Sequence, residues 1–258
     1  MDYIHAIVLG IIQGIAELFP VSSAAHTLLI SALLKWPLPS LPFVVMLHLG
    51  TFLAVLLYFA KDYWRLVVGF FTGFADKFKG PDQRLSLLVI AGTIPVFLVG
   101  KAGESFFDGL FGNPIFAAIF LLVTGAVLFA IEQIPPPVAP EVVDLNPSSS
   151  RMYFPPVRLE DHPGAAGLPW WKAVIVGISQ VGGLFPGGSR SGFSIAAGMW
   201  AGLTREEAAR FSFLLAGPAI VGASAFEMLR IISPRSPKPA RRCSTASRIW
   251  AHRRRRSP

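Results

Sequence analysis

Apolar residues gather in long runs along this chain, and polar residues are confined to short stretches between them. Three runs are long enough, or nearly so, to cross the roughly 30 Å of hydrocarbon in a bilayer as helices: Phe43–Ala60, Ile115–Ile134 and Phe211–Ile232. A fourth run, Leu85–Gly100, is shorter and contains Pro95, which membrane helices tolerate when their neighbours satisfy the freed backbone groups. The pattern predicts an all-α polytopic membrane protein.

Two other apolar stretches are interrupted half-way by proline, glycine and a cluster of polar residues. Ile4–Leu34 and Trp170–Leu203 each predict a helix, a break and a second helix. Irregular backbone at membrane depth occurs only where it is buried in protein or lines a cavity. Paired breaks of this kind indicate a binding site within the membrane, so the chemistry is expected there.

The two broken stretches resemble each other. Both carry glycine, glutamine, phenylalanine and proline in the same order, as Gly10, Gln13, Phe19 and Pro20 and as Gly177, Gln180, Phe185 and Pro186. This similarity indicates two inverted repeats, each opening with a re-entrant broken helix pair. The predicted organisation is a single membrane domain over 1–232, with repeat one at 1–134, a cytoplasmic linker at 135–169 and an incomplete repeat two at 170–232.

The composition supports a membrane protein. Hydrophobic residues make up 53% of the 258 residues and charged residues 15%, against about 25% charged residues in soluble domains. The net charge of +8 arises at the end of the chain, because nine of the 23 basic residues follow Pro234. The other 14 basic residues nearly balance the 15 acidic ones, so the charge gives little support to nucleic-acid binding.

Residues 233–258 are rich in arginine, serine and proline and contain no apolar run, which predicts a basic disordered tail. Three apolar runs follow the first break and one follows the second, so two expected membrane helices are missing. A truncated or frameshifted end is the favoured explanation. A genuine basic tail that contacts anionic lipid is the alternative.

The distribution of basic residues predicts the orientation in the membrane. The stretch Lys61–Arg84 is the most basic loop outside the tail and is therefore expected in the cytoplasm. Alternation then places residues 101–113 outside and the linker 135–169 inside. The two broken stretches would enter the membrane from opposite faces.

The first break carries an amide, a carboxylate, two hydroxyls and an imidazole, on Gln13, Glu17, Ser22, Ser23 and His26. The amide and the carboxylate are four residues apart and share one helix face. Pro20 ends that helix, the serines can cap the next helix, and the imidazole follows one turn later. The spacing predicts that these groups meet near one point inside the membrane.

The second break carries glycines, hydroxyls and one guanidinium, on Gly187, Gly188, Ser189, Arg190, Ser191 and Ser194. Glycines let backbone amides approach an anion, and the following helix offers its N-terminus. Arg190 adds a permanent forked charge suited to phosphate oxygens. The Gly-Lys-Ser/Thr of a P-loop does not follow, so the motif predicts a phosphate site of another kind.

Structural roles were weighed against functional ones. Charges at membrane depth are costly without a partner, which favours a functional role for Glu17 and Arg190. Ser22 and Ser23 could equally be helix caps. His48, in the middle of a predicted span, could line the site, but a packed and hydrogen-bonded histidine is the favoured interpretation.

Together the two motifs resemble the undecaprenyl pyrophosphate phosphatase family of the BacA type, over about residues 1–232. The resemblance is carried by Gly10-x-x-Gln13-x-x-x-Glu17-x-x-Pro20-Val21-Ser22-Ser23-x-x-His26 and by Pro186-Gly-x-Ser189-Arg190-Ser191. Ser194 stands where the family usually has threonine, and the hydroxyl is kept.

The resemblance implies an enzyme of the bacterial inner membrane that hydrolyses undecaprenyl pyrophosphate to the monophosphate. This reaction recycles the carrier lipid of cell wall synthesis, and the family is linked to bacitracin resistance. A divalent cation, Mg²⁺ or Ca²⁺, is implied, with Glu17 and Gln13 as its candidate ligands. By motif the catalytic residues are Glu17, Ser23, His26 and Arg190, and the substrate-binding residues are Gln13, Ser22, Gly187, Gly188, Ser189, Ser191 and Ser194.

In the mechanism that this suggests, Arg190 and the amides of residues 187–191 hold the pyrophosphate, and His26 acts as base on Ser23 or on water. A phosphoserine intermediate and direct attack by water both stay open, as do the lipid chain length and the oligomeric state, including a homodimer. The alternative function is a transporter or flippase of a polyprenyl phosphate lipid or another anion, because broken helices aimed at an anion are also transporter architecture.

Overall fold

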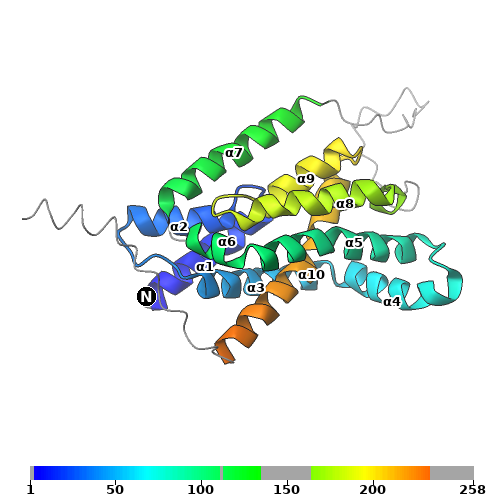
Figure 1. Ribbon diagram of the computed structural model, residues 1–258, viewed down its shortest axis with the longest axis horizontal. Helices are drawn as coiled ribbons and strands as arrows, with labels where there is room; N and C mark the ends of the chain where they lie inside the picture. The colour runs from blue at the N-terminus through cyan, green and yellow to red at the C-terminus, as the bar shows by residue number, and fades with distance from the viewer. Residues whose placement is uncertain (1–2, 111–112, 135–163, 233–258) are drawn as a thin grey trace, which may run out of the picture. The chain divides into compact units, whose positions relative to one another are not determined.

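The computed structural model describes residues 3–110, 113–134 and 164–232, and these residues form helices and no strands. The longer helices are labelled in Figure 1. In chain order they are α1 (Tyr3–Leu18), α2 (Ser23–Leu33), α3 (Leu41–Tyr58), α4 (Ala60–Asp76), α5 (Pro81–Ala102), α6 (Glu104–Leu110), α7 (Pro114–Glu132), η1 (Gly164–Gly167), α8 (Trp170–Ser179), η2 (Gln180–Leu184), α9 (Arg190–Trp200) and α10 (Arg205–Ile232). The chain divides into two compact units, residues 1–224 and 225–258, and the packing described below lies within the first.

Four helices are long and apolar enough to cross a membrane: Leu41–Tyr58, Pro81–Ala102, Pro114–Glu132 and Arg205–Leu229. They match the four predicted runs, including the one that contains Pro95. The predicted all-α, polytopic class is therefore confirmed. The predicted tail at 233–258 and the linker up to residue 163 lie outside the described residues.

One predicted loop is a helix. Residues 61–84 were expected to form a basic loop, but α4 and the first turn of α5 occupy most of this stretch. The helix is amphipathic: Leu66, Gly69 and Gly73 are buried at three- and four-residue spacing, while Phe71 and Phe74 are exposed. The basic residues hid this period from an analysis that looked for long apolar runs.

Both predicted breaks are present in the described chain. In the first, α1 ends at Leu18 and α2 begins at Ser23. In the second, α8 passes into η2, and α9 begins at Arg190. The helices on either side of each break pack against each other, as expected for re-entrant pairs. The division into repeats and their inverted relation stay predictions.

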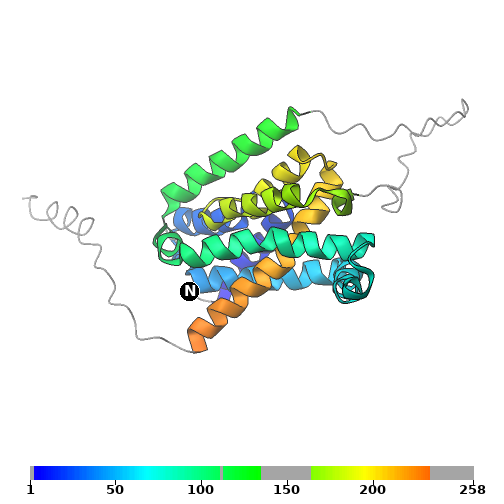
Figure 2. The ribbon, with the colours of Figure 1, turned by 45° about the vertical axis from the view of Figure 1, so that its right-hand side comes forward.

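The main core joins the second broken pair to the spanning helices. α5 lies alongside α8 in both views, and the two helices meet at glycines (Figures 1 and 2). A β-carbon at Gly177 would collide with the backbone of Gly92, so this crossing requires glycine. Phe211 and Leu215 of α10 are almost fully buried in the same cluster. The second break is thus held on a rigid support.

Candidate active site

The carboxylate of Glu17 is the centre of the candidate site. Gln13 and Glu17 lie one turn apart on α1, and both are buried. Gln13 Nε2 donates to Glu17 Oε2 at 3.1 Å, and Ser23 Oγ donates to the same oxygen at 2.6 Å. The predicted grouping of amide, carboxylate and hydroxyl in the first break is therefore present.

Ser22 gives the first break its shape. Its φ of 63° is left-handed, which is uncommon for a residue other than glycine and marks local strain. Ser22 Oγ accepts from the amide of Ala25 at 3.3 Å and so caps α2. The same oxygen lies 3.3 Å from the carbonyl oxygen of Gly188, to which it donates. Ser22 thus acts as a cap and also joins the first break to the second.

Arg190 brings the second break to the carboxylate. Its Nη2 lies 3.0 Å from Glu17 Oε1, and the two side chains are only 16% and 9% exposed. The other terminal nitrogen, Nη1, is buried and forms no hydrogen bond within the described chain. A buried guanidinium nitrogen without a partner is costly, so this nitrogen is a ready donor for an anion.

The glycine loop before α9 can offer part of its backbone to an anion. Gly187 has a φ of 98°, and a β-carbon there would collide with the backbone of Ala117. The amide of Gly188 donates to Phe185 O at 2.9 Å, and that of Ser189 donates to Thr124 Oγ1 at 3.2 Å. The first amides of a helix have no partner within the helix. The predicted anion-binding amides are thereby narrowed to those of residues 187, 190 and 191.

The predicted serines of the second break are not equivalent. Ser189 caps α9 by accepting from the Gly192 amide at 3.0 Å, and its Oγ lies 3.3 Å from Ser191 Oγ. Ser194 Oγ donates to the Arg190 carbonyl at 2.8 Å and lies 2.7 Å from Ser212 Oγ of α10. The hydroxyl of Ser194 is therefore engaged between α9 and α10 rather than in the Glu17 cluster.

His26 lies near the cluster without bonding to its carboxylate. Its Nδ1 is 2.8 Å from the carbonyl oxygen of Ser22, and since a carbonyl only accepts, Nδ1 carries the proton. In the described chain His26 has no hydrogen bond to Glu17 or Ser23. The predicted meeting of imidazole and carboxylate is thus made by another histidine.

That histidine is His48 of α3, which the sequence analysis interpreted as a packed residue. Its Nδ1 lies 2.8 Å from Val44 O, which agrees with a hydrogen-bonded histidine. Its Nε2, however, lies 3.3 Å from Glu17 Oε2 and 3.4 Å from Ser23 Oγ. A polar group in the middle of an apolar span was the available signal.

The donor set fits a divalent cation that is shared with a substrate. No group of three or more His, Cys, Asp or Glu side chains that could hold a metal occurs among the described residues. Mg²⁺ is often held by one or two carboxylates together with water and substrate phosphates. Glu17 supplies a carboxylate, and Gln13 Oε1 is buried without a hydrogen-bond partner in the described chain. A carbonyl oxygen of this kind suits a hard cation.

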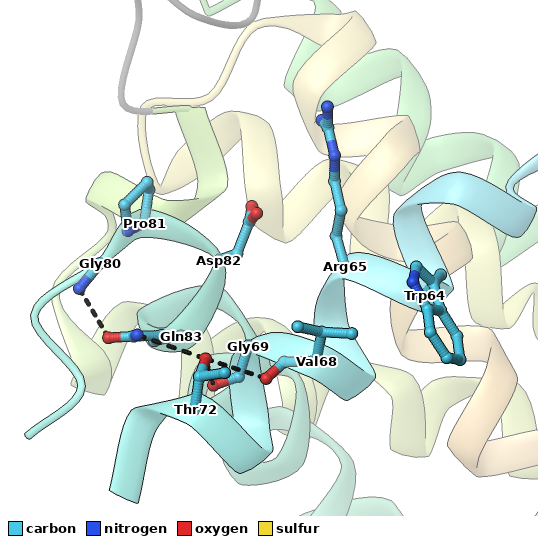
Figure 3. Close-up of a pocket in the computed structure, with 9 residues that line it drawn as sticks. All are labelled: Trp64, Arg65, Val68, Gly69, Thr72, Gly80, Pro81, Asp82 and Gln83. Carbon is cyan, nitrogen blue, oxygen red and sulfur yellow. Dashed lines mark hydrogen bonds between the residues drawn. The ribbon is translucent and has the colours of Figure 1, made fainter. Parts of the chain in front are cut away.

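A separate cavity of about 320 Å³ lies between α4 and the start of α5 (Figure 3). Trp64, Arg65 and Asp82 are among its lining residues. None of the predicted site residues lines it, and it belongs to the predicted cytoplasmic stretch. The candidate active site is the Glu17 cluster.

Comparisons with known proteins agree with the motifs. The sequence profile described as "Bacitracin resistance protein BacA" matches residues 6–248. The chain is similar to the undecaprenyl-diphosphatase of Mycolicibacterium paratuberculosis, with 39% identity over 246 residues that cover 91% of this chain and 80% of the relative. It is also similar to that of Geotalea daltonii, with 39% identity and coverage of 92% and 80%, and to undecaprenyl-diphosphatase 2 of Oenococcus oeni, with 35% identity and coverage of 92% and 79%. The chain therefore belongs to the BacA bacitracin resistance protein family.

Proposed function

We propose that this chain is a membrane phosphatase that hydrolyses undecaprenyl diphosphate to undecaprenyl phosphate and phosphate. The observation that carries the proposal is the state of Arg190, whose Nη2 binds Glu17 while the buried Nη1 has no partner in the described chain. A diphosphate can accept hydrogen bonds from both nitrogens of this fork. Curated relatives that share more than a third of their residues with this chain bear the same enzyme name.

Substrate binding would begin in the second break. Arg190 and the amides of residues 187, 190 and 191 lie where α9 starts, which favours negative charge. The diphosphate would then compete with Glu17 Oε1 for the guanidinium. Phosphoryl transfer depends mainly on position and charge neutralisation, and this arrangement supplies both.

The hydroxyl of Ser23 is placed to be the nucleophile. Ser23 Oγ donates to Glu17 Oε2 at 2.6 Å, so the carboxylate can take its proton when the oxygen attacks the terminal phosphorus. Attack breaks the bond to the bridging oxygen and releases the polyprenyl monophosphate. Water then hydrolyses the phosphoserine and yields phosphate. His26, which has no hydrogen bond to Ser23, is proposed to serve as base for this water.

A divalent cation bound by Glu17 and Gln13 would neutralise charge on the phosphate oxygens. The residues of the chain do the positioning: Gln13 holds the carboxylate at 3.1 Å, and Ser22 holds the two breaks together through the Gly188 carbonyl. Both contacts are buried and keep their strength in a site from which water is largely excluded.

An aromatic cluster beside the anion loop suits the isoprenoid chain. It comprises residues of α6, α7 and the second break, namely Phe106, Phe107, Phe116, Phe120 and Phe185. The rings of Phe120 and Phe185 stack at 4.4 Å, and Phe185 directly precedes the Pro-Gly-Gly turn. The first isoprene units of a bound lipid would leave the loop over this apolar surface.

The proposed location is the bacterial inner membrane, with the lipid diphosphate as substrate and the bilayer as the surroundings. The alternative of a transporter or flippase is not favoured, because transport needs no hydroxyl that is hydrogen-bonded to a carboxylate. Four apolar helices of spanning length agree with a multi-pass protein.

Phosphate release from a C55 or C15 isoprenyl diphosphate by the purified chain in detergent with Mg²⁺ tests the proposal. Detergent abolishes any gradient, so a transporter would release nothing. We expect release by the parent chain and its loss in Glu17→Gln, with Glu206→Gln of the first turn of α10 as a matched control. An inactive but folded parent chain would contradict the proposed function.

A further inference from the structure

We infer that His48 is a positioning residue of this site, which holds the Glu17–Ser23 pair from the side of the spanning helix α3. The inference rests on the proposed function and deepens it, since it names a residue that the motifs of the two breaks do not include. Its basis is that three polar atoms from three different helices meet at one point.

The ring of His48 is fixed by its own helix. Nδ1 donates to the carbonyl oxygen of Val44 at 2.8 Å, one turn earlier on α3. A carbonyl oxygen cannot donate, so the Nδ1 proton and the orientation of the ring are set by this contact. The opposite nitrogen, Nε2, therefore points at the site.

Nε2 completes a triangle with the two reacting groups of the first break. The distances are 2.6 Å from Ser23 Oγ to Glu17 Oε2, 3.3 Å from Oε2 to His48 Nε2, and 3.4 Å from Nε2 to Ser23 Oγ. A protonated Nε2 donates to the carboxylate, and an unprotonated Nε2 accepts from the hydroxyl. His48 thus has a partner in either form, so the inference does not depend on its protonation state.

The need for such a residue follows from the competition for Arg190. When a diphosphate draws the guanidinium away, Glu17 Oε1 loses its partner at 3.0 Å. Gln13 and Ser23 still bind Oε2, but both belong to the same re-entrant pair as Glu17 and move with it. His48 belongs to a helix of membrane-spanning length that packs against α1. It can keep the carboxylate in place while Arg190 binds phosphate.

Placement alone could still reflect simple packing. The side chain of His48 is 24% exposed, so it could have turned Nε2 away from a carboxylate. Thr51 of the same helix shows what a purely local polar residue does. Its hydroxyl donates to the carbonyls of Leu47 and His48, at 3.4 Å and 3.0 Å, within its own helix. Thr51→Ala is therefore a matched control at similar depth.

The test measures kcat and KM for phosphate release from a C15 isoprenyl diphosphate by His48→Ala, His48→Gln and Thr51→Ala. Loss of an outer partner of a ligating group commonly lowers activity by about 10- to 100-fold. We expect a fall of this size in kcat for His48→Ala with KM nearly unchanged, a kcat within about threefold of the parent for His48→Gln, whose amide can still bond to Glu17, and parental values for Thr51→Ala. Free imidazole should restore part of the activity of His48→Ala, which a packing role would not produce.

A second measurement separates positioning from misfolding. In a double-mutant cycle, His48→Ala should cost less in the Ser23→Ala background than in the parent, because both residues act on Glu17 Oε2. Parental kcat in His48→Ala, or equal additive losses without imidazole rescue, would overturn the inference and leave the proposed function intact. No release by the parent chain would instead overturn the proposed function and the inference together.

Discussion

Arg190 and Glu17 are 173 positions apart in the sequence, yet Nη2 of the arginine lies 3.0 Å from Oε1 of the glutamate. The pair joins the start of α9 to the end of α1 and so makes one site of the two breaks. Each charge is the partner that the other needs at membrane depth. The same pairing means that a phosphate must displace the carboxylate from the guanidinium. The pair therefore stabilises the empty site and selects for an anionic ligand.

The left-handed backbone of Ser22 predicts an unusual order of stabilities. Replacing a serine cap by alanine costs about 0.5–2 kcal/mol, whereas glycine costs only a few tenths. The φ of 63° adds to the cost for alanine and not for glycine. We expect Ser22→Gly to melt at a higher temperature than Ser22→Ala in detergent. The reverse order would show that the contact from Ser22 Oγ to Gly188, which both variants lose, does not explain the stability.

Gly187 and Gly202 form a natural pair of variants. Both have a φ near 100°, but a β-carbon meets the backbone of Ala117 at Gly187 and nothing within 4 Å at Gly202. Alanine at either position pays for the left-handed backbone, roughly 1–2 kcal/mol. Gly187→Ala must also move α7 away from the anion loop. We expect it to lose stability and phosphatase activity, while Gly202→Ala loses only stability, measured by thermal melting and phosphate release. Equal activity in both variants would contradict the role of the loop.

Phe120 tests the proposed path of the lipid. Its ring stacks on Phe185 at 4.4 Å, whereas Phe129 of the same helix is 71% exposed. Removing a packed ring from a binding surface commonly costs about 1.4 kcal/mol, which is tenfold in affinity. We expect Phe120→Ala to raise KM for a C15 isoprenyl diphosphate about tenfold and Phe129→Ala to leave it unchanged. Similar KM values in the two variants would show that the chain leaves the site elsewhere.

The amide of Gln13 predicts how the site depends on metal. Its Oε1 is buried without a hydrogen-bond partner in the described chain, while its Nε2 holds Glu17. We expect a chelator to abolish phosphate release and added Mg²⁺ or Ca²⁺ to restore it. Gln13→Leu should need roughly tenfold more metal for half-maximal rate, because one hard oxygen ligand is lost. Full activity in excess chelator would exclude the cation.

The sequence was sufficient for features that depend on local pattern or on the cost of burying charge. The four spanning helices follow from the length of their apolar runs, and Glu17 and Arg190 stand out because charges at membrane depth need a reason. Helix α4 was missed because its apolar face alternates with basic residues and so resembles a loop. Its buried positions are visible only once α5 packs against it.

The contacts of single side chains could not be predicted in the same way. His48 has no polar neighbour in sequence, and its role depends on α1 and α2 lying against α3. Ser194 matched a motif, yet its hydroxyl is engaged with Ser212, which comes from the next helix. His26 and Glu17 are close in sequence, but the helix start places His26 Nδ1 on the Ser22 carbonyl instead. Such details depend on tertiary packing rather than on spacing.

The most direct test of the central claim is phosphate release from a C55 isoprenyl diphosphate by Arg190→Ala, compared with the parent chain at equal folded concentration. The account predicts release by the parent and a loss of at least about 100-fold in the variant, since the charge that both binds the diphosphate and stabilises its transition state is gone. Release by Arg190→Ala at a rate close to that of the parent would contradict a phosphatase site built on the Arg190–Glu17 pair.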